Sequence, residues 1–324
     1  MAWDDILGHD LAKRIWQAHL ATGRVSSAYL LAGPEGIGKR RLALEMAKAL
    51  NCLAEALRPC DTCPVCGQIN RQTHPDVHVV GPSGASNQIK IEDIRHLIGR
   101  LVLRPYSARV QVAILDGVER LTEEAANSLL KVLEEPSVST RFLLTTSQLS
   151  HCLPTIVSRC QVIRCQPLPA AVVRQLLVKA HGVDPQLAET IARAAQGSAA
   201  RAIELAERWN AYESLFARCA DTSPERWLTQ PLPETRDEVT QLLEGMMGWL
   251  RDLAVAATGD PTWVTHTARA GVLQRQARAV DVDHCVRTAF EVVELRESLE
   301  QFVSPRLVAA LAREKWLSLH LADV

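Results

Sequence analysis

The segment Gly33–Arg40, with the sequence Gly-Pro-Glu-Gly-Ile-Gly-Lys-Arg, constrains the fold of this chain more than any other. An apolar run directly precedes it, and a helical pattern follows it. A strand, a glycine-rich turn and a helix N-terminus in this order are the setting of a phosphate-binding loop, where backbone N–H groups and a lysine meet an anion. The residues expected in these roles are Gly33, Gly36, Gly38 and Lys39.

The pattern G-x-x-x-x-G-K-[ST] fails at its last position, because Arg40 replaces the hydroxyl residue that would ligate Mg²⁺. Asp116 follows an apolar strand and is the expected carboxylate on the Mg²⁺ side. A hydrolysing site commonly adds an adjacent carboxylate, but the next residue is Gly117, and Glu119 is expected to point elsewhere. The residues themselves leave open whether this site hydrolyses a nucleotide or is only built like one that does.

Four of the nine cysteines form a second cluster with the spacing C-x₇-C-x₂-C-x₂-C, at Cys52, Cys60, Cys63 and Cys66. Four thiolates in a closed tetrahedral set are the arrangement that structural Zn²⁺ prefers, so we expect one structural zinc ion per chain. The alternative is a set of free thiols in a loop that has lost its metal. His74 could substitute as a ligand, or it could cap the turn before the next strand.

Charge and hydropathy exclude two broad classes of protein. The formal net charge of −1 gives no global basic field of the kind that marks a nucleic-acid binder. No run approaches the roughly 18 apolar residues of a membrane span. The first five residues are acidic and lack the apolar core of a signal peptide. A cytoplasmic protein is therefore expected, in which an odd number of cysteines argues against a disulfide framework.

The first half of the chain alternates between strand and helix patterns, which predicts an α/β domain with a parallel sheet and helices on both faces. The expected strands are residues 28–32, 77–80, 110–115, 141–146 and 161–165. Beyond Pro167 and Pro169 every periodic stretch is helical. The expected domains are 1–166 with a zinc module at 52–66, a small helical lid at 167–208, and an all-α collar or oligomerisation domain at 209–324.

Three further stretches resemble a known family. The runs at 116–136, 142–146 and 156–160, together with the phosphate loop and the four-cysteine insertion, resemble the clamp-loader branch of the AAA+ ATPases. The resemblance extends over about the first 200 residues, and the helical tail fits the family's collar domain by length and class. It implies a P-loop AAA+ domain followed by a lid and a collar.

The departures from this family fall in one site. Catalytic members carry Thr or Ser after the loop lysine, an Asp-Glu pair, and an arginine in the lid motif G-S-x-R. This chain has Arg40, Gly117 and Ala200 there, with Arg201 displaced by one position. The resemblance therefore implies a non-motor subunit of the bacterial DNA polymerase III clamp loader, itself neither a polymerase nor an efficient ATPase. ATP binding stays open.

The resemblance also implies partners and a trans-acting residue. The subunit would complete a five-membered ring with gamma/tau and delta subunits, which loads the β sliding clamp onto primed DNA. Arg159, between Ser158 and Cys160, matches the arginine that projects into a neighbour's ATP site. In trans, such an arginine stabilises charge on the transferring phosphoryl group. The alternative is a local ion pair with a carboxylate.

Two further resemblances are weaker. Thr146 matches the residue that senses the γ-phosphate in active relatives, or it is a strand-end hydroxyl bonded to backbone. Residues 6–9, Ile-Leu-Gly-His, match the family's segment beside adenine, or they are an ordinary turn before a helix.

The sequence is compatible with three functions. The first is the non-motor clamp-loader subunit, the second is an active ATPase of the same superfamily, and the third is a zinc-stabilised DNA-binding adaptor with a vestigial nucleotide fold. The near-neutral charge argues against the third.

Overall fold

The computed structural model describes residues 3, 6–54, 58–84, 86–221, 223–259, 264–266, 269–300 and 303–321. Its contacts divide the chain into two compact units. Unit 1 comprises residues 1–176 and 196–201, and unit 2 comprises 177–195 and 202–324. Each unit is described by itself.

Unit 1 is built on a five-stranded sheet whose strands are all parallel, in the order β2-β3-β4-β1-β5. The strands are β1 (Ala28–Ala32), β2 (Val77–Val80), β3 (Gln111–Leu115), β4 (Thr140–Thr146) and β5 (Gln161–Arg164). The predicted parallel α/β domain is confirmed, and each strand begins and ends within one residue of its expected bounds. This order places β1, which leads into the phosphate loop, between β4 and β5.

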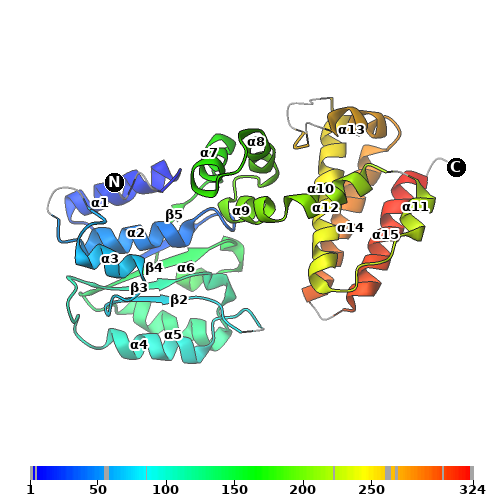
Figure 1. Cartoon of the computed structure of the whole chain (residues 1–324). Helices are drawn as coiled ribbons and strands as arrows, with labels where there is room; N and C mark the ends of the chain where they lie inside the picture. The colour runs from blue at the N-terminus through cyan, green and yellow to red at the C-terminus, as the bar shows by residue number, and fades with distance from the viewer. Residues whose placement is uncertain are drawn as a thin grey trace. The chain divides into compact units, whose positions relative to one another are not determined.

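Helices cover both faces of the sheet, as Figure 1 shows. The elements are α1 (Asp10–Thr22), α2 (Lys39–Asn51), α3 (Pro64–Asn70), α4 (Ile91–Leu101), η1 (Val118–Arg120), α5 (Glu123–Glu134), η2 (Leu149–His151) and α6 (Pro154–Val157). Alternate strand residues face opposite ways. Tyr29 and Leu31 pack with α1, α2 and α3, whereas Ala28 and Leu30 pack with α4, α5 and α6. Strands β1 and β3 are buried along their whole length, which explains their near-continuous apolar sequences, whereas the edge strand β5 is partly exposed.

Helix α5 illustrates how local sequence sets the bounds of an element. The Thr122 hydroxyl caps its first turn by accepting a hydrogen bond from the N–H of Ala125 at 3.3 Å. Glu123 and Glu124 place negative charge at the positive end of the helix dipole. The helix ends at Glu134, two residues before Pro136, which cannot continue a helix. Its apolar face then packs under β3 and β4.

The helical region begins with α7 (Ala170–His181), and the other helices are α8 (Pro185–Ala194), α9 (Ala199–Glu207), α10 (Trp209–Cys219), α11 (Pro224–Thr229), α12 (Arg236–Ala257), α13 (Ala270–Ala277), α14 (Val282–Glu300) and α15 (Pro305–Leu321). Within unit 2, α12 packs against α10, α13, α14 and α15. A capping box of Thr235 and Glu238 begins this helix, and Trp249 is buried on it. The expected all-helical second half of the chain is confirmed for the described residues.

None of the helices in the described part of the chain is long and apolar enough to cross a membrane.

Candidate functional site

The phosphate loop joins β1 to α2. The N–H of Gly33 donates to the carbonyl oxygen of Thr146 at 3.1 Å, which fixes the start of the loop to the end of β4. Gly36 and Gly38 have φ of 75° and 99°, in the left-handed region that favours glycine. Gly38 caps α2 without a side-chain hydrogen bond, so the first N–H groups of this 13-residue helix have no side-chain acceptor from the cap. This geometry suits an anion.

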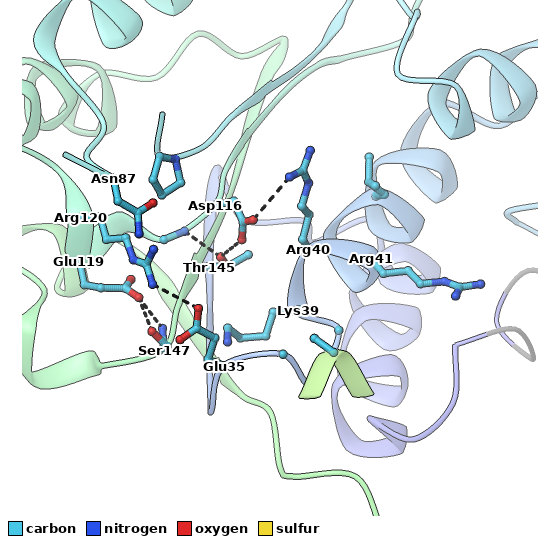
Figure 2. Close-up of a pocket in the computed structure, with 16 residues that line it drawn as sticks. Glu35, Lys39, Arg40, Arg41, Asn87, Asp116, Glu119, Arg120, Thr145 and Ser147 are labelled. Atoms are coloured by element: carbon cyan, nitrogen blue, oxygen red, sulfur yellow. Dashed lines mark hydrogen bonds and ion pairs between the residues drawn. The ribbon is translucent and has the colours of Figure 1, made fainter. Parts of the chain in front are cut away.

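A cavity of about 570 Å³ opens beside this loop (Figure 2). It is lined by Glu35, Gly36, Gly38, Lys39, Arg40, Arg41, Leu44, Pro82, Asn87, Asp116, Gly117, Glu119, Arg120, Thr145, Ser147 and Ala200. Five residues that the sequence assigned to nucleotide binding are therefore brought together here. Among the described residues, Gly33 and Thr146 do not line it.

The ammonium group of Lys39 is turned onto the loop itself. Its Nζ donates to the carbonyl oxygens of Gly33 at 2.7 Å and Pro34 at 2.6 Å. Burial lowers the pKa of Lys39, and the charges of Glu119 and Asp116 act in the opposite direction. An ammonium group has three N–H donors, so one remains for a phosphate oxygen with both loop bonds in place.

Asp116 has a partner for each carboxylate oxygen. The Thr145 hydroxyl donates to Oδ1 at 2.6 Å, and the Arg40 guanidinium lies 3.8 Å from Oδ2. Arg40 also donates to the side-chain oxygen of Gln72 at 3.2 Å. The N–H of Gly117 donates to the Thr145 hydroxyl at 3.0 Å. An arginine thus stands beside the carboxylate that the sequence pattern predicts on the Mg²⁺ side.

The expectation that Glu119 points elsewhere is wrong, because its side chain lines the cavity (Figure 2). Glu119 follows the turn at Gly117 within the short helix η1, which carries it back toward the loop. It accepts hydrogen bonds from the hydroxyl and the N–H of Ser147, the latter at 3.0 Å. Burial raises the pKa of Glu119, but these bonds outweigh it and the net shift is downward, so the carboxylate is ionised near neutral pH.

The segment 196–201 returns to unit 1 and contacts the loop. The N–H of Ala200 donates to the carbonyl oxygen of Gly36 at 3.0 Å, and Ala200 lines the cavity. The N–H of Arg201 donates to the Ser198 hydroxyl at 3.2 Å, and its side chain is not among the described residues that line the cavity. A methyl group therefore stands at the position where the resemblance expects an arginine in active members.

The four cysteines converge on one point at the end of α2. Their sulfur atoms all lie within 4.8 Å of one another. A tetrahedron of Zn–S bonds near 2.3 Å separates its sulfurs by about 3.8 Å. The N–H groups of Cys63 and Cys66 donate to the sulfurs of Cys60 and Cys63, each at 3.4 Å. The cluster could therefore bind a metal such as zinc.

Thiols with shifted pKa values and a buried lysine lie in and beside the cysteine cluster. Hydrogen bonds, led by the Thr62 side chain, lower the pKa of Cys60 to about 6, whereas burial raises the pKa of Cys66. Lys48, which is buried, joins Glu45 and Asp61 and so ties the cysteine loop to α2. His74 is not part of the cluster among the described residues. Its Nδ1 accepts from the N–H of Asp76 at 3.1 Å, which confirms that it caps the turn before β2.

Arg159 follows α6 and lies outside the cavity lining, as far as the described residues go. Its guanidinium contacts Glu134 of α5 at 2.5 Å and donates to the carbonyl oxygen of Thr155 at 3.0 Å. About a third of its side chain is exposed, at 34%. In the isolated chain it therefore occupies the local ion pair that was the alternative to a role in trans.

The remaining candidates lie at the rim of the loop. The Thr146 hydroxyl accepts from the N–H of Gln148 at 3.1 Å and from the thiol of Cys152 at 3.2 Å. Thr145, whose side chain faces the other side of β4, lines the cavity instead. Because side chains alternate along a strand, a comparison with the position of Asp116 could have indicated Thr145. Nε2 of His9 lies 2.8 Å from the carbonyl oxygen of Ile37, which joins the segment at 6–9 to the loop.

Comparison with known proteins gives a consistent result. A family model described as DNA polymerase III, delta subunit, matches residues 8–169, half of the chain. The delta-prime subunit of DNA polymerase III from Bacillus subtilis (strain 168) is 37% identical over 182 residues, covering 56% of this chain and 54% of that protein. The delta-prime subunit from Pseudomonas aeruginosa is 41% identical over 170 residues, covering 52% and 49% respectively.

The tau subunit of DNA polymerase III from Escherichia coli (strain K12) is 31% identical over 210 residues, covering 63% of this chain and 32% of that protein. The chain spans about half the length of the two delta-prime relatives it matches. The match includes the phosphate loop, the cysteine cluster and Arg159. The chain therefore belongs to the DNA polymerase III delta-prime subunit family.

Proposed function

We propose that this chain is a non-motor subunit of the DNA polymerase III clamp loader that acts in the cytoplasm. It joins gamma/tau and delta subunits in a ring that places the β sliding clamp on primed DNA. One observation carries the proposal: Arg40, Gly117 and Ala200 occupy this chain's own cavity, while Arg159 lies outside it. In this proposal, residues 1–166 form the AAA+ domain, residues 167–208 the lid and residues 209–324 the collar.

The chain's own cavity suits binding better than turnover. Lys39 and the N-terminal N–H groups of α2 present donors to a phosphate chain. The metal-ligating hydroxyl is replaced by Arg40, and both oxygens of Asp116 have partners. We therefore expect ATP to bind here without efficient hydrolysis, since Mg²⁺ placement is a main part of phosphoryl transfer.

Arg159 would act in a neighbouring subunit's ATP site. Its ion pair with Glu134 is partly exposed, and such pairs are worth only about 0–1 kcal/mol. A phosphate group offers the planar guanidinium a bidentate, charge-assisted partner, which is a stronger interaction. The pair with Glu134 therefore holds the side chain in place until a nucleotide-bearing partner displaces it.

Reconstitution tests this function. We expect Arg159→Ala to assemble normally with gamma/tau and delta subunits but to lower the ATP turnover and clamp loading of the complex. A trans-acting arginine is worth about 10³–10⁵ in rate at the site it serves, so that site's share of turnover should vanish. Arg24→Ala, at an exposed position in the turn after α1, is the matched control. Unchanged activity in a complex that contains Arg159→Ala would refute the trans role.

Glu119 favours a second candidate, an active ATPase of the same superfamily. The ionised carboxylate of Glu119 lines the same cavity as Lys39. Its Oε2 atom is buried and has no hydrogen-bond partner among the described residues. A rotation of the side chain that exposes Oε2 to the cavity would let it orient a water molecule. ATP turnover by the isolated chain at ordinary rates, abolished by Glu119→Gln, would support this candidate over the non-motor role.

We also propose that the cysteine cluster binds one structural Zn²⁺ through Cys52, Cys60, Cys63 and Cys66. Four sulfur ligands close the coordination sphere, and a closed set is typical of structural rather than catalytic zinc. When bound, the ion would cross-link the end of α2 to the start of α3.

A further inference from the structure

We propose that the Arg40 guanidinium replaces Mg²⁺ beside Asp116, so that this cavity binds a nucleoside di- or triphosphate without a divalent cation. This proposal rests on the nucleotide-binding part of the proposed function. Among the sixteen residues that line the cavity, it assigns the place of the metal ion to Arg40. Arg40 is the departure from the phosphate-loop pattern, and it becomes the specificity-determining residue of the site.

The position of Arg40 carries the inference. It is the second residue of α2, so its side chain leaves the helix next to the backbone N–H groups that face an anion. Its guanidinium lies 3.8 Å from Oδ2 of Asp116 and 3.2 Å from the side-chain oxygen of Gln72. Figure 2 shows Arg40 directed toward Asp116, while Arg41 projects away from it. Two contacts from different loops hold the guanidinium at the carboxylate.

Charge explains why the site needs a cation there. A carboxylate next to a phosphate chain repels it unless a cation lies between them, and Mg²⁺ ordinarily serves this purpose. A guanidinium carries a fixed positive charge, and that of Arg40 lies against Asp116. Its five N–H donors exceed the two contacts it makes here, so the remaining donors can reach phosphate oxygens.

The carboxylate is also poorly disposed toward a metal. Oδ1 of Asp116 accepts from the Thr145 hydroxyl at 2.6 Å, and that hydroxyl in turn accepts from the N–H of Gly117 at 3.0 Å. A divalent cation would have to displace Arg40 from Oδ2 and would find no hydroxyl on residue 40. Mg²⁺ is dehydrated reluctantly and requires near-ideal octahedral geometry, so this exchange is unfavourable.

The experiment measures the affinity of the full chain for a fluorescent ATP analogue, and separately for ADP, in EDTA and in excess MgCl₂. Zinc content is checked in each sample because EDTA also competes for the cysteine cluster. We expect the wild-type dissociation constants in the two conditions to agree within about twofold. Arg40→Thr restores the hydroxyl and removes the guanidinium, so its binding should weaken about tenfold in EDTA and recover with Mg²⁺.

Arg95→Thr is the matched control. It removes the same charge from an exposed position of α4 that does not line the cavity, so it tests whether net charge alone explains any loss. It is expected to leave the ratio of affinities with and without Mg²⁺ near one. Thermal unfolding of each variant verifies that it is folded.

The outcomes separate this inference from the function on which it rests. Binding by the wild type that requires Mg²⁺ would overturn the role of Arg40 and leave nucleotide binding intact. No binding in either condition would overturn both, while the Arg159 proposal would still be decided by reconstitution. Loss of metal-independent binding in Arg95→Thr to the same extent as in Arg40→Thr would also overturn the specific role of Arg40.

Discussion

Each departure from the active pattern at the phosphate loop has a contact of its own in the structure. Arg40 pairs with Asp116, and Ala200 donates its N–H to the loop carbonyl of Gly36. Gly117 has a φ of 79°, a conformation that a glutamate in its place would adopt only with strain. Restoring the active residues one at a time would therefore disturb existing contacts as well as add missing chemistry.

Gly33 gives a residue-scale prediction for stability. A Cβ atom added there would lie 2.2 Å from the backbone carbonyl oxygen of Cys165, which cannot move without shifting the strand connection. We expect Gly33→Ala to destabilise unit 1 by about 1–3 kcal/mol, the usual cost of overpacking a filled site. Urea unfolding followed by circular dichroism measures it.

Gly99 is the matched control for this substitution. It lies inside α4, and a Cβ atom there would have no heavy atom within 4 Å. Because alanine is favoured over glycine in a helix, Gly99→Ala should stabilise by up to about 1 kcal/mol. Equal losses in the two variants would show that the close approach at Gly33 is not what excludes a side chain.

At the scale of elements, α2 connects the two sites of unit 1. It begins at Lys39 in the cavity and is capped by Cys52 of the cysteine cluster, 13 residues and about 20 Å further on. Lys48 fastens its last turn to the cysteine loop through Asp61. A metal ion bound by the four cysteines would therefore stabilise the far end of the helix whose first turn would receive a phosphate.

Metal analysis tests the cluster. We expect elemental analysis to find one zinc per chain. Cys60→Ser should lose the zinc and unfold locally between residues 52 and 66, because a closed thiolate site that loses one of its ligands loses most of its affinity for the metal. The sheet should remain folded, since the core between the sheet and α4, α5 and α6 contains no residue of the segment 52–66. Cys160→Ser, outside the cluster, should keep its zinc. Wild-type protein purified without metal addition and containing no zinc would contradict the assignment.

In unit 2, a buried carboxylate ties a loop to α12. Asp252 accepts hydrogen bonds from the backbone N–H groups of Thr265 and His266 at 3.0 and 2.8 Å, and its Oδ2 lies 2.7 Å from Nδ1 of the His266 ring. Burial raises the pKa of Asp252, but the bonds from His266 and Thr265 outweigh it, and the net shift is downward from 3.8. The ionised form is therefore the one that the folded state stabilises.

The sign of the pH dependence follows from that shift. A carboxylate with a lowered pKa contributes stability above its unfolded value near 3.8, and this contribution is lost as the pH falls through the folded pKa. We expect Asp252→Asn to cost about 1.5–3 kcal/mol at neutral pH, a difference that shrinks below pH 3.8. Urea midpoints measured across this range test it. Asp237→Asn, exposed in the first turn of the same helix, should cost only about 0.3–1 kcal/mol, from the lost charge at the helix dipole.

At the scale of the whole molecule, charge argues against a DNA-binding adaptor. With a net charge of −1, the isolated chain should bind duplex or primed DNA weakly. A titration at several salt concentrations measures this. Tight binding whose affinity falls steeply with salt would revive the adaptor hypothesis, since the slope counts the phosphates that the protein neutralises.

Much of the fold could be predicted from the sequence because its determinants are local. Apolar runs between turns gave the strands to within one residue, and the spacing of the four cysteines gave the cluster, since both depend on residues close together in the chain. The segment Gly33–Arg40 gave the loop for the same reason. The error at Glu119 arose because a short helix after Gly117 reverses the chain direction, which no periodicity reveals.

The sequence by itself determined which groups this chain has and which it lacks: glycines and a lysine for an anion, four thiolates for a metal, and no hydroxyl at position 40. Only the tertiary structure decided what those groups meet, because side chains distant in sequence become neighbours where parallel strands end at one edge of a sheet. It placed Arg40 against Asp116 and Arg159 against Glu134. Such pairings depend on strand order and loop path, which local sequence does not encode.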